Sequence, residues 1–150
     1  MVVSGRRAKE VARLLELKKV EIWGSHGLER LTPEGMLELD HIDSRTMQAV
    51  TRANVMLERA GLAKLIEHKP FGNAVHWRGF SVERAMEAQE SVEEVWAAIP
   101  GKSLLRMLRF DGGIEICAAS ANKERVVHRV AAELGGQYSM AYPFLQHSIP

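Results

Sequence analysis

The sequence predicts a mixed α+β and α/β protein in which helices cover one face of an antiparallel sheet, with pieces of α/β type at both ends. Two short links, Pro70-Phe71-Gly72 and Asp111-Gly112-Gly113, each join two strand-like runs, and links this short allow only antiparallel hairpins. Two capped segments repeat apolar residues every three or four positions, which predicts helices. At the N-terminus an apolar run leads directly into a helical pattern, which is typical of an α/β unit.

The first residues predict short strands and a helix. Three short runs predict strands: the apolar run 1–4, and 20–23 and 28–31 around the turn residues 24–27. Between the first two runs, three apolar residues share one helical face: Ala8, Val11 and Leu15. Pro33-Glu34-Gly35 predicts a turn after the third run.

Two longer helices are predicted to lie on the sheet. The first is capped by Asp43 or Ser44 and ends at Gly61. Its apolar positions are Met47, Val50, Ala53, Leu57 and Ala60. The second begins after Ser81 and stops at Pro100-Gly101, with Ala85, Ala88, Val92, Val95 or Trp96, and Ile99 inward.

The sheet itself is predicted from the two hairpins. Their strands are 65–69, 73–78, 104–110 and 114–118. Asn122 is placed to cap a last helix, whose apolar face is Val127, Val130, Ala131 and Leu134. The tail from Tyr142 has two prolines and no periodicity, which predicts an irregular end.

The composition excludes several classes of partner. The chain has 150 residues, of which 46% are hydrophobic, enough for a core. Its net charge of +1 creates no field that selects nucleic acid or an anionic membrane, and no apolar run approaches the roughly 20 residues needed to span a bilayer. The single Cys117 excludes an internal disulfide, so we expect a cytoplasmic protein with Cys117 buried in a strand.

One hairpin face gathers groups that suit a polyhydroxylated ligand. Alternate residues of a strand share a face, so Glu67 lies with Lys69, and His76 with Arg78 on the neighbouring strand. Carboxylates accept hydrogen bonds from hydroxyl groups, while Lys and Arg donate to them and also attract phosphate. The alternative is a solvated face with surface ion pairs worth about 0–1 kcal/mol.

Four other positions carry groups that can meet a ligand. Ser4 ends a strand, at the sheet edge where α/β proteins hold ligands, although Ser-Gly also makes ordinary turns. Lys123 follows the cap Asn122, so an ammonium joins a helix N-terminus that favours phosphate; a surface lysine is the alternative. His26 stands between two glycines, and Glu115 between two isoleucines on a strand, where each also has an ordinary structural explanation.

Four segments in order resemble trehalose-6-phosphate phosphatase of the haloacid dehalogenase superfamily. They are SGR at 4–6, GSHGLER at 24–30, EHK at 67–69 with HWR at 76–78, and GIEI at 113–116 with NK at 122–123. The resemblance covers residues 1–142. It implies a partial haloacid-dehalogenase-type α/β core in 1–27 and 119–150, with an inserted cap domain in 28–118.

The resemblance also implies an activity and a set of roles. The family hydrolyses trehalose 6-phosphate to trehalose and phosphate with Mg²⁺. Ser4 matches the residue that holds a phosphoryl oxygen, and Lys123 the one that neutralises its charge. The residues that match sugar contacts are Glu67, Lys69, Arg78 and Glu115, with Asn122 and His26 as further candidates.

The sequence departs from the family pattern at the reacting groups. No Asp-x-Asp pair precedes Ser4 and no Gly-Asp-Asp follows Tyr142, so the nucleophile and the magnesium ligands are absent from the chain. Glu124 replaces a glycine beside Lys123, and His68-Lys69-Pro70 replaces Asp-Lys-Gly. Because covalent phosphoryl transfer needs both the nucleophile and the metal, we expect this polypeptide alone to be inactive.

Three hypotheses follow. The chain is a phosphatase truncated or split at both ends, or a binding or regulatory module that senses trehalose 6-phosphate or pairs with a chain carrying the missing aspartates, or an α+β remnant without a ligand. An incomplete core would leave the strand at 1–4 exposed, which predicts self-association.

Overall fold

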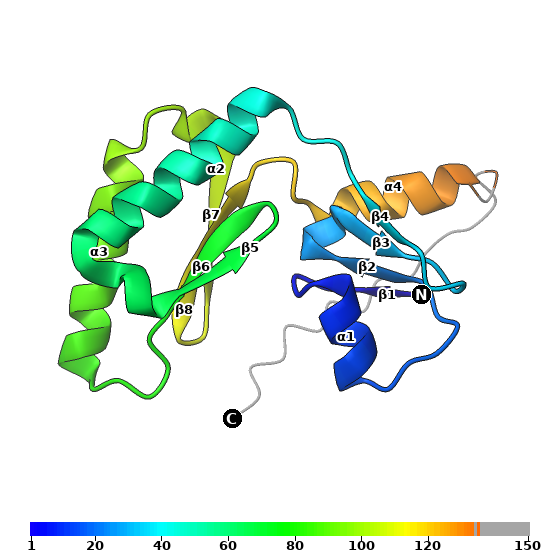
Figure 1. The fold of residues 1–150 in the computed structure, drawn as a ribbon, viewed down its shortest axis with the longest axis horizontal. Helices are drawn as coiled ribbons and strands as arrows, with labels where there is room; N and C mark the ends of the chain where they lie inside the picture. The colour runs from blue at the N-terminus through cyan, green and yellow to red at the C-terminus, as the bar shows by residue number, and fades with distance from the viewer. Residues whose placement is uncertain (134, 136–150) are drawn as a thin grey trace.

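The computed structural model describes residues 1–133 and 135, which form two four-stranded sheets placed side by side (Figure 1). The first sheet has the order β1-β2-β3-β4. Its strands are β1 (Val2–Val3), β2 (Ile22–Gly24), β3 (Glu29–Leu31) and β4 (Leu37–Leu39). β1 runs parallel to β2, and the other pairs are antiparallel.

Two helices sandwich the first sheet. α1 (Ala8–Leu14) packs Ala8 and Val11 against Ile22, while α4 (Lys123–Glu133) packs Val126 and Val130 against Trp23. Because neighbouring residues of a strand point to opposite faces, Ile22 and Trp23 lead to the two different helices. This parallel pair with helices on both faces is the predicted α/β piece.

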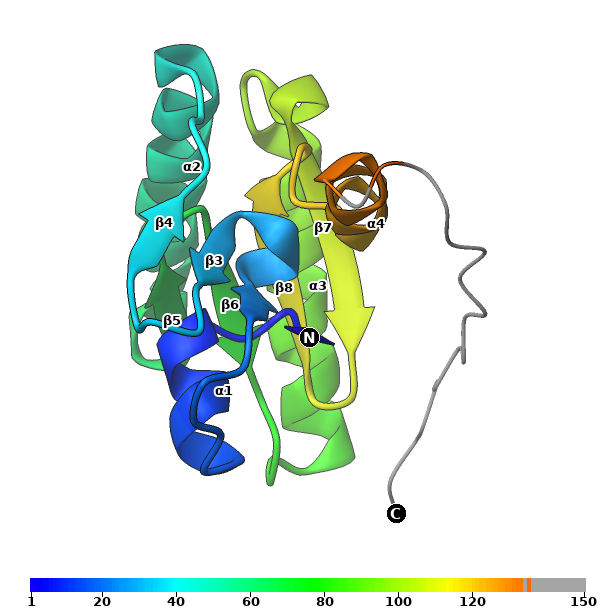
Figure 2. The ribbon, with the colours of Figure 1, turned by 90° about the vertical axis from the view of Figure 1, so that its right-hand side faces the viewer.

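The second sheet is antiparallel throughout and has the order β5-β6-β8-β7. Its strands are β5 (Ile66–Lys69), β6 (Gly72–His76), β7 (Leu105–Phe110) and β8 (Gly113–Ala118). They form the two predicted hairpins. Both α2 (Ser44–Leu57) and α3 (Val82–Ala98) cover the face that is turned away from the first sheet (Figures 1 and 2).

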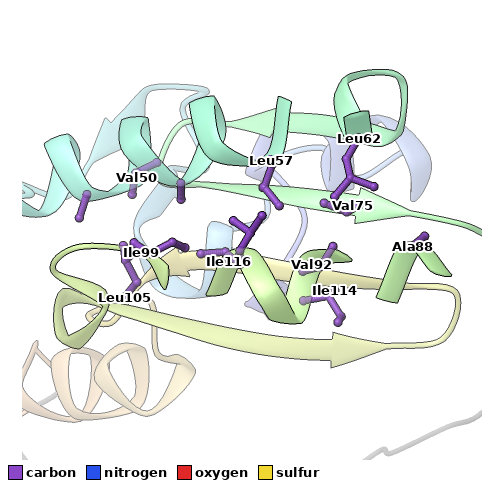
Figure 3. Close-up of a cluster of buried hydrophobic side chains, with 13 residues drawn as sticks. Val50, Leu57, Leu62, Val75, Ala88, Val92, Ile99, Leu105, Ile114 and Ile116 are labelled. Carbon is purple, nitrogen blue, oxygen red and sulfur yellow. The ribbon is translucent and has the colours of Figure 1, made fainter. Parts of the chain in front are cut away.

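The main core lies between the second sheet and its two helices (Figure 3). Val75, Ile114 and Ile116 come from the strands, and Val50, Leu57 and Val92 are among their helical partners. Both predicted caps are confirmed, since the Asp43 side chain accepts from the backbone N–H groups of Arg45 and Thr46, and the Ser81 hydroxyl accepts from Arg84 N–H. A π turn at Glu58–Leu62 ends α2, with Gly61 in the left-handed region at φ 82°.

The boundaries of several elements differ from the predicted ones. β4 was not predicted from the sequence, and Val127 was expected on the inner face of α4, where Val126 and Val130 are the buried residues. Leu15 lies beyond α1 and is exposed. The expected boundary at residue 28 falls inside the first sheet, between β2 and β3, because β3 pairs with β2; a cap domain at 28–118 stays a prediction. Leu134 and the tail from Tyr142 lie outside the described residues.

Two further findings concern membrane-spanning helices and the single cysteine. Within residues 1–133 and 135, no helix combines the length and apolar character needed to cross a bilayer. Cys117 is a buried residue of β8, and burial raises the pKa of its thiol to about 12. The thiol therefore stays protonated at neutral pH. The prediction that Cys117 is buried in a strand is confirmed.

Truncating a side chain of the main core should destabilise the fold. Ile116 is 1% exposed between the second sheet and its helices, so Ile116→Ala should lower the free energy of unfolding by about 2–5 kcal/mol. The measurement is urea unfolding followed by circular dichroism. Val82→Ala is the control, because Val82 is 71% exposed and its truncation should change the value by less than about 0.5 kcal/mol. Equal effects would contradict the assigned core.

Candidate functional site

The loop after β1 is tied to the loop after β2 by backbone hydrogen bonds. Ser4 N–H donates to the carbonyl of Trp23 at 2.8 Å, and His26 N–H donates to the carbonyl of Ser4 at 3.0 Å. The Ser4 hydroxyl oxygen accepts from Arg6 N–H at 3.1 Å. Ser4 and His26 are therefore held next to each other, at the carboxyl end of the parallel strand pair.

Small residues allow this loop pair to close. His26 has φ 56°, in the left-handed region, and its imidazole lies against Gly5. A Cβ atom at Gly5 would come within 2.6 Å of the ring. On the other side, a Cβ at Gly27 would lie 3.2 Å from the carbonyl oxygen of Asn122 and 2.5 Å from Val126. The glycines on each side thus bring His26 between Ser4 and the start of α4.

Asn122 and Lys123 open α4 beside this loop. The Asn122 Oδ1 atom accepts from Glu124 N–H at 2.9 Å, which confirms the predicted cap. The Glu124 carboxylate turns back to the same residue, since Asn122 Nδ2 donates to it at 3.3 Å. Lys123 is exposed. The helix N-terminus therefore presents an ammonium and a carboxylate together.

A buried carboxylate joins the two sheets. Glu115, on β8, is 7% exposed and faces away from the helices of its own sheet. Lys69 Nζ of β5 donates to Glu115 Oε2 at 2.9 Å, and His26 Nε2 of the first sheet's loop lies 3.4 Å from the same oxygen. Lys69, Glu115 and His26 come from three separate segments. The sequence predicted these three residues on two hairpins and one loop, but not that they are in contact.

The two partners outweigh the burial of Glu115. Burial alone raises the pKa of this carboxyl, but hydrogen bonds from His26 and Lys69 and the charge of Lys69 lower it, and the net pKa is below the ordinary value. The carboxylate form is thus the stable one in the fold. A charged, nearly buried carboxylate whose second oxygen, Oε1, has no hydrogen-bond partner among the described residues can accept from a ligand hydroxyl.

The other sugar-contact candidates lie farther from the first sheet. Glu67 shares the open face of the second sheet with Lys69, and its carboxylate lies 2.7 Å from His76 Nε2. Arg78 lies beyond the end of β6 and pairs with Asp111 of the β7–β8 turn at 3.1 Å, with both side chains exposed. The structure therefore does not bring Arg78 to the Lys69, Glu115 and His26 cluster.

The role of Glu29 was not predicted from the sequence, although the residue lies in the GSHGLER segment. Glu29 is 1% exposed, and its Oε2 accepts from the backbone N–H of Ala8 at 2.7 Å. Arg7 Nε lies 3.5 Å from the other oxygen. A negative charge at the N-terminus of α1 fixes the end of the Ser4 loop.

The described residues do not fit the magnesium ion that the family resemblance implies. Over residues 1–133 and 135, no three His, Cys, Asp or Glu side chains gather closely enough to hold a metal ion. Magnesium is held by carboxylates, and the Glu124 carboxylate beside Lys123 is engaged with Asn122.

Comparison with known proteins finds relatives among trehalose-phosphate phosphatases. No family model matches the chain. It is 28% identical to the trehalose-phosphate phosphatase of Mycobacterium leprae over 77% of the chain and 29% identical to that of Mycobacterium tuberculosis over 77%. A protein of Mycobacterium tuberculosis described as an uncharacterized glycosyl hydrolase is 31% identical over 65% of the chain. The chain spans 26–28% of the length of the two phosphatases and 7% of the third protein.

Solved structures of trehalose-6-phosphate phosphatases and related proteins share the fold of this chain. The C-terminal domain of Candida albicans trehalose-6-phosphate phosphatase superposes with a TM-score of 0.71, over 87% of this chain and 46% of that one, at 17% identity. A trehalose-6-phosphate phosphatase related protein gives a TM-score of 0.61, over 87% and 56%, also at 17% identity. The predicted resemblance and the predicted haloacid-dehalogenase-type fold class are both confirmed.

The Glu115 contacts predict a pH-dependent difference in stability. Because the folded pKa lies below the ordinary 4.5, the ionised carboxylate stabilises the fold above that pH and loses this contribution as the pH falls through the folded value. Glu115→Gln should therefore lower the free energy of unfolding by about 1–3 kcal/mol at pH 7. The difference from the parent protein should shrink as the pH falls below 4.5, as urea unfolding across this range would measure.

The matched control is Glu90→Gln on the exposed side of α3, which should leave stability unchanged at each pH. A Glu115→Gln deficit of constant size from pH 7 to below 4.5 would show that the charge of Glu115 does not contribute.

Proposed function

We propose that this chain binds trehalose 6-phosphate between its two sheets, as the substrate-recognition part of a trehalose-6-phosphate phosphatase. The observation that carries the proposal is the Glu115 cluster, in which His26 of the phosphate-side loop meets Lys69 and Glu115 of the sugar-side sheet. The sequence relatives named trehalose-phosphate phosphatase support the choice of substrate.

The phosphoryl group is proposed to lie at Ser4 and Lys123. A hydroxyl donor at the end of a strand and an ammonium at a helix N-terminus together suit a phosphoryl oxygen. The side chain of His26 lies between this position and Glu115. Its imidazole contacts Glu115, and its backbone N–H donates to the carbonyl of Ser4. A sugar phosphate held at Ser4 would therefore extend toward the second sheet.

The sugar hydroxyl groups are proposed to meet Glu115, Lys69 and Glu67, with His26 and Asn122 at the phosphate side. Glu115 accepts through its second oxygen, and Lys69 keeps donor capacity beyond its single bond to Glu115. Arg78 joins these contacts only if its exposed side chain leaves Asp111, a surface pair worth about 0–1 kcal/mol.

Hydrolysis itself needs groups that these 150 residues do not offer. The chain has three aspartates, and each one has a partner elsewhere: Asp40 pairs with Arg125, Asp43 caps α2, and Asp111 pairs with Arg78. An aspartate nucleophile and the magnesium ligands would then come from a further segment of the protein or from a complementary chain. The cytoplasm is the proposed location, because Cys117 is a lone thiol.

The proposal predicts binding without turnover. In calorimetric titrations, the 150-residue polypeptide should bind trehalose 6-phosphate more tightly than trehalose, because only the former reaches Ser4 and Lys123. Incubation with trehalose 6-phosphate and Mg²⁺ should release no phosphate above the rate without protein. Chelator-sensitive release would refute the predicted lack of turnover, and the absence of binding to either sugar would refute the proposed function.

Neutralising Glu124 should increase the affinity for trehalose 6-phosphate. Its carboxylate lies at the N-terminus of α4 beside Lys123, where it competes with an incoming phosphoryl group. Glu124→Gln should tighten binding of trehalose 6-phosphate by about three- to tenfold at low salt, since a like charge a few ångströms away costs about 1 kcal/mol in water.

The gain should fade above physiological ionic strength, because salt screens exposed charges. Glu90→Gln on α3 removes the same charge far from α4 and should leave the affinity unchanged. An equal gain in both variants would indicate a general charge effect and not a phosphate position at Lys123.

A further inference from the structure

Within residues 1–133, the chain passes between the two sheets twice. The first linker, 40–43, joins β4 to α2, and the second linker, 119–122, joins β8 to α4 (Figure 1). A change in the relative orientation of the sheets must change backbone angles in both linkers. The contacts that the linkers make therefore decide how far the sheets can move against each other.

Each linker is anchored to a different sheet. In the first linker, Asp40 N–H donates to the carbonyl of Leu28, just before β3, at 2.8 Å. In the second linker, Ala119 N–H donates to the carbonyl of Leu104, just before β7, at 2.9 Å. The first linker is thus fixed to the first sheet, and the second linker is fixed to the second sheet.

The guanidinium of Arg125, on α4, joins the two linkers. Its NH2 group donates to Asp40 Oδ2 at 2.8 Å, and its NH1 group donates to the carbonyl of Ser120 at 3.3 Å. The next carbonyl of the second linker, that of Ala121, accepts from Arg106 of β7 at 2.8 Å. Adjacent carbonyls of one linker are therefore held from both sheets.

The position of Arg125 is unfavourable for α4 itself. Arg125 is the third residue of the helix, and the helix dipole disfavours a cation in the first turn. Ile42 of the first linker also packs against the apolar cluster that contains Ala121, but apolar contacts have no direction. The planar fork of a guanidinium does have a direction, so it can fix the orientation of the two groups that it bridges.

We propose that Arg125 is a positioning residue for the ligand, because its bonds to both linkers hold the two sheets in the orientation in which His26 meets Glu115. This inference rests on the proposed function. Lys123 points to a different side of α4, since two helical residues differ by about 200°. Arg125 therefore acts without touching the phosphoryl group. Without its bonds, fewer molecules present the Ser4 loop and Glu115 together, and binding pays for ordering them.

The first measurement is the distance between the two sheets. Spin labels on Lys9→Cys of α1 and Glu90→Cys of α3, both exposed positions, report this distance by pulsed electron paramagnetic resonance. Cys117 is buried, so the labels attach to the introduced cysteines. Arg125→Gln should broaden the distance distribution. Arg125→Lys should broaden it as well, because a single ammonium lacks the fork that reaches both linkers.

The second measurement is calorimetric titration of the unlabelled chains with trehalose 6-phosphate. Arg125→Gln should weaken binding by about two- to fivefold, the range of a half-exposed ion pair. Arg125→Lys keeps the positive charge, so a loss in this variant cannot come from weaker attraction of phosphate. Asp40→Asn should cause a similar loss, and the double variant Arg125→Gln with Asp40→Asn should lose no more than either single variant, because both changes remove the same contact.

The control is Arg109→Gln, which removes an ion pair of similar exposure and equal length, 2.8 Å, between β7 and α3. It should change neither the distances nor the affinity, and thermal unfolding should show all variants folded. If Arg125→Gln leaves the distances unchanged, or broadens them without a loss of affinity, Arg125 does not position the ligand and the proposed function stands. If the parent chain does not bind trehalose 6-phosphate, both proposals are wrong.

Discussion

The contact between the Ser4 loop and the second sheet depends on one buried carboxylate, Glu115. A charge removed from water is costly unless charged or polar partners replace the lost hydration. Glu115 takes one partner from each sheet, Lys69 from its own and His26 from the other. Its burial is therefore favourable only when the two sheets lie against each other, and the same contact that holds the sheets also brings the sugar-side groups to the phosphate-side loop.

The backbone conformation of the loop after β2 places His26 beside that carboxylate. Left-handed conformations at Ser25 and His26, the close approach of the imidazole to Gly5, and the contact of Gly27 with Asn122 leave few alternatives for the residues of this loop. Glu29 adds a second constraint by holding the N-terminus of α1. A segment such as GSHGLER is thus informative because its spacing encodes packing between three elements.

Local chemistry made much of the fold predictable, and distant contacts account for what was not. Turn residues fixed both hairpins, and Asp43, Ser81 and Asn122 fixed helix starts, because each acts on its own neighbours. The rotation of α4 depended on Trp23, a residue about 100 positions away, so Val126 and not Val127 faces inward. Arg78 was expected on a strand face, but β6 ends at His76, where Trp77 N–H bonds to the carbonyl of Gly112.

Burial divides the proposed sugar contacts into two kinds with different consequences. At Glu115 and Lys69 the side chains already pair with each other, so a ligand hydroxyl adds to an existing network and gains only if it leaves the Lys69 contact intact. At Glu67 the carboxylate is half-exposed and pairs with His76, so a ligand can replace this surface contact without breaking a buried pair. The buried cluster therefore suits the positioning of the proposed sugar phosphate, whereas the exposed end of the same sheet face can exchange its surface contacts for those of a ligand.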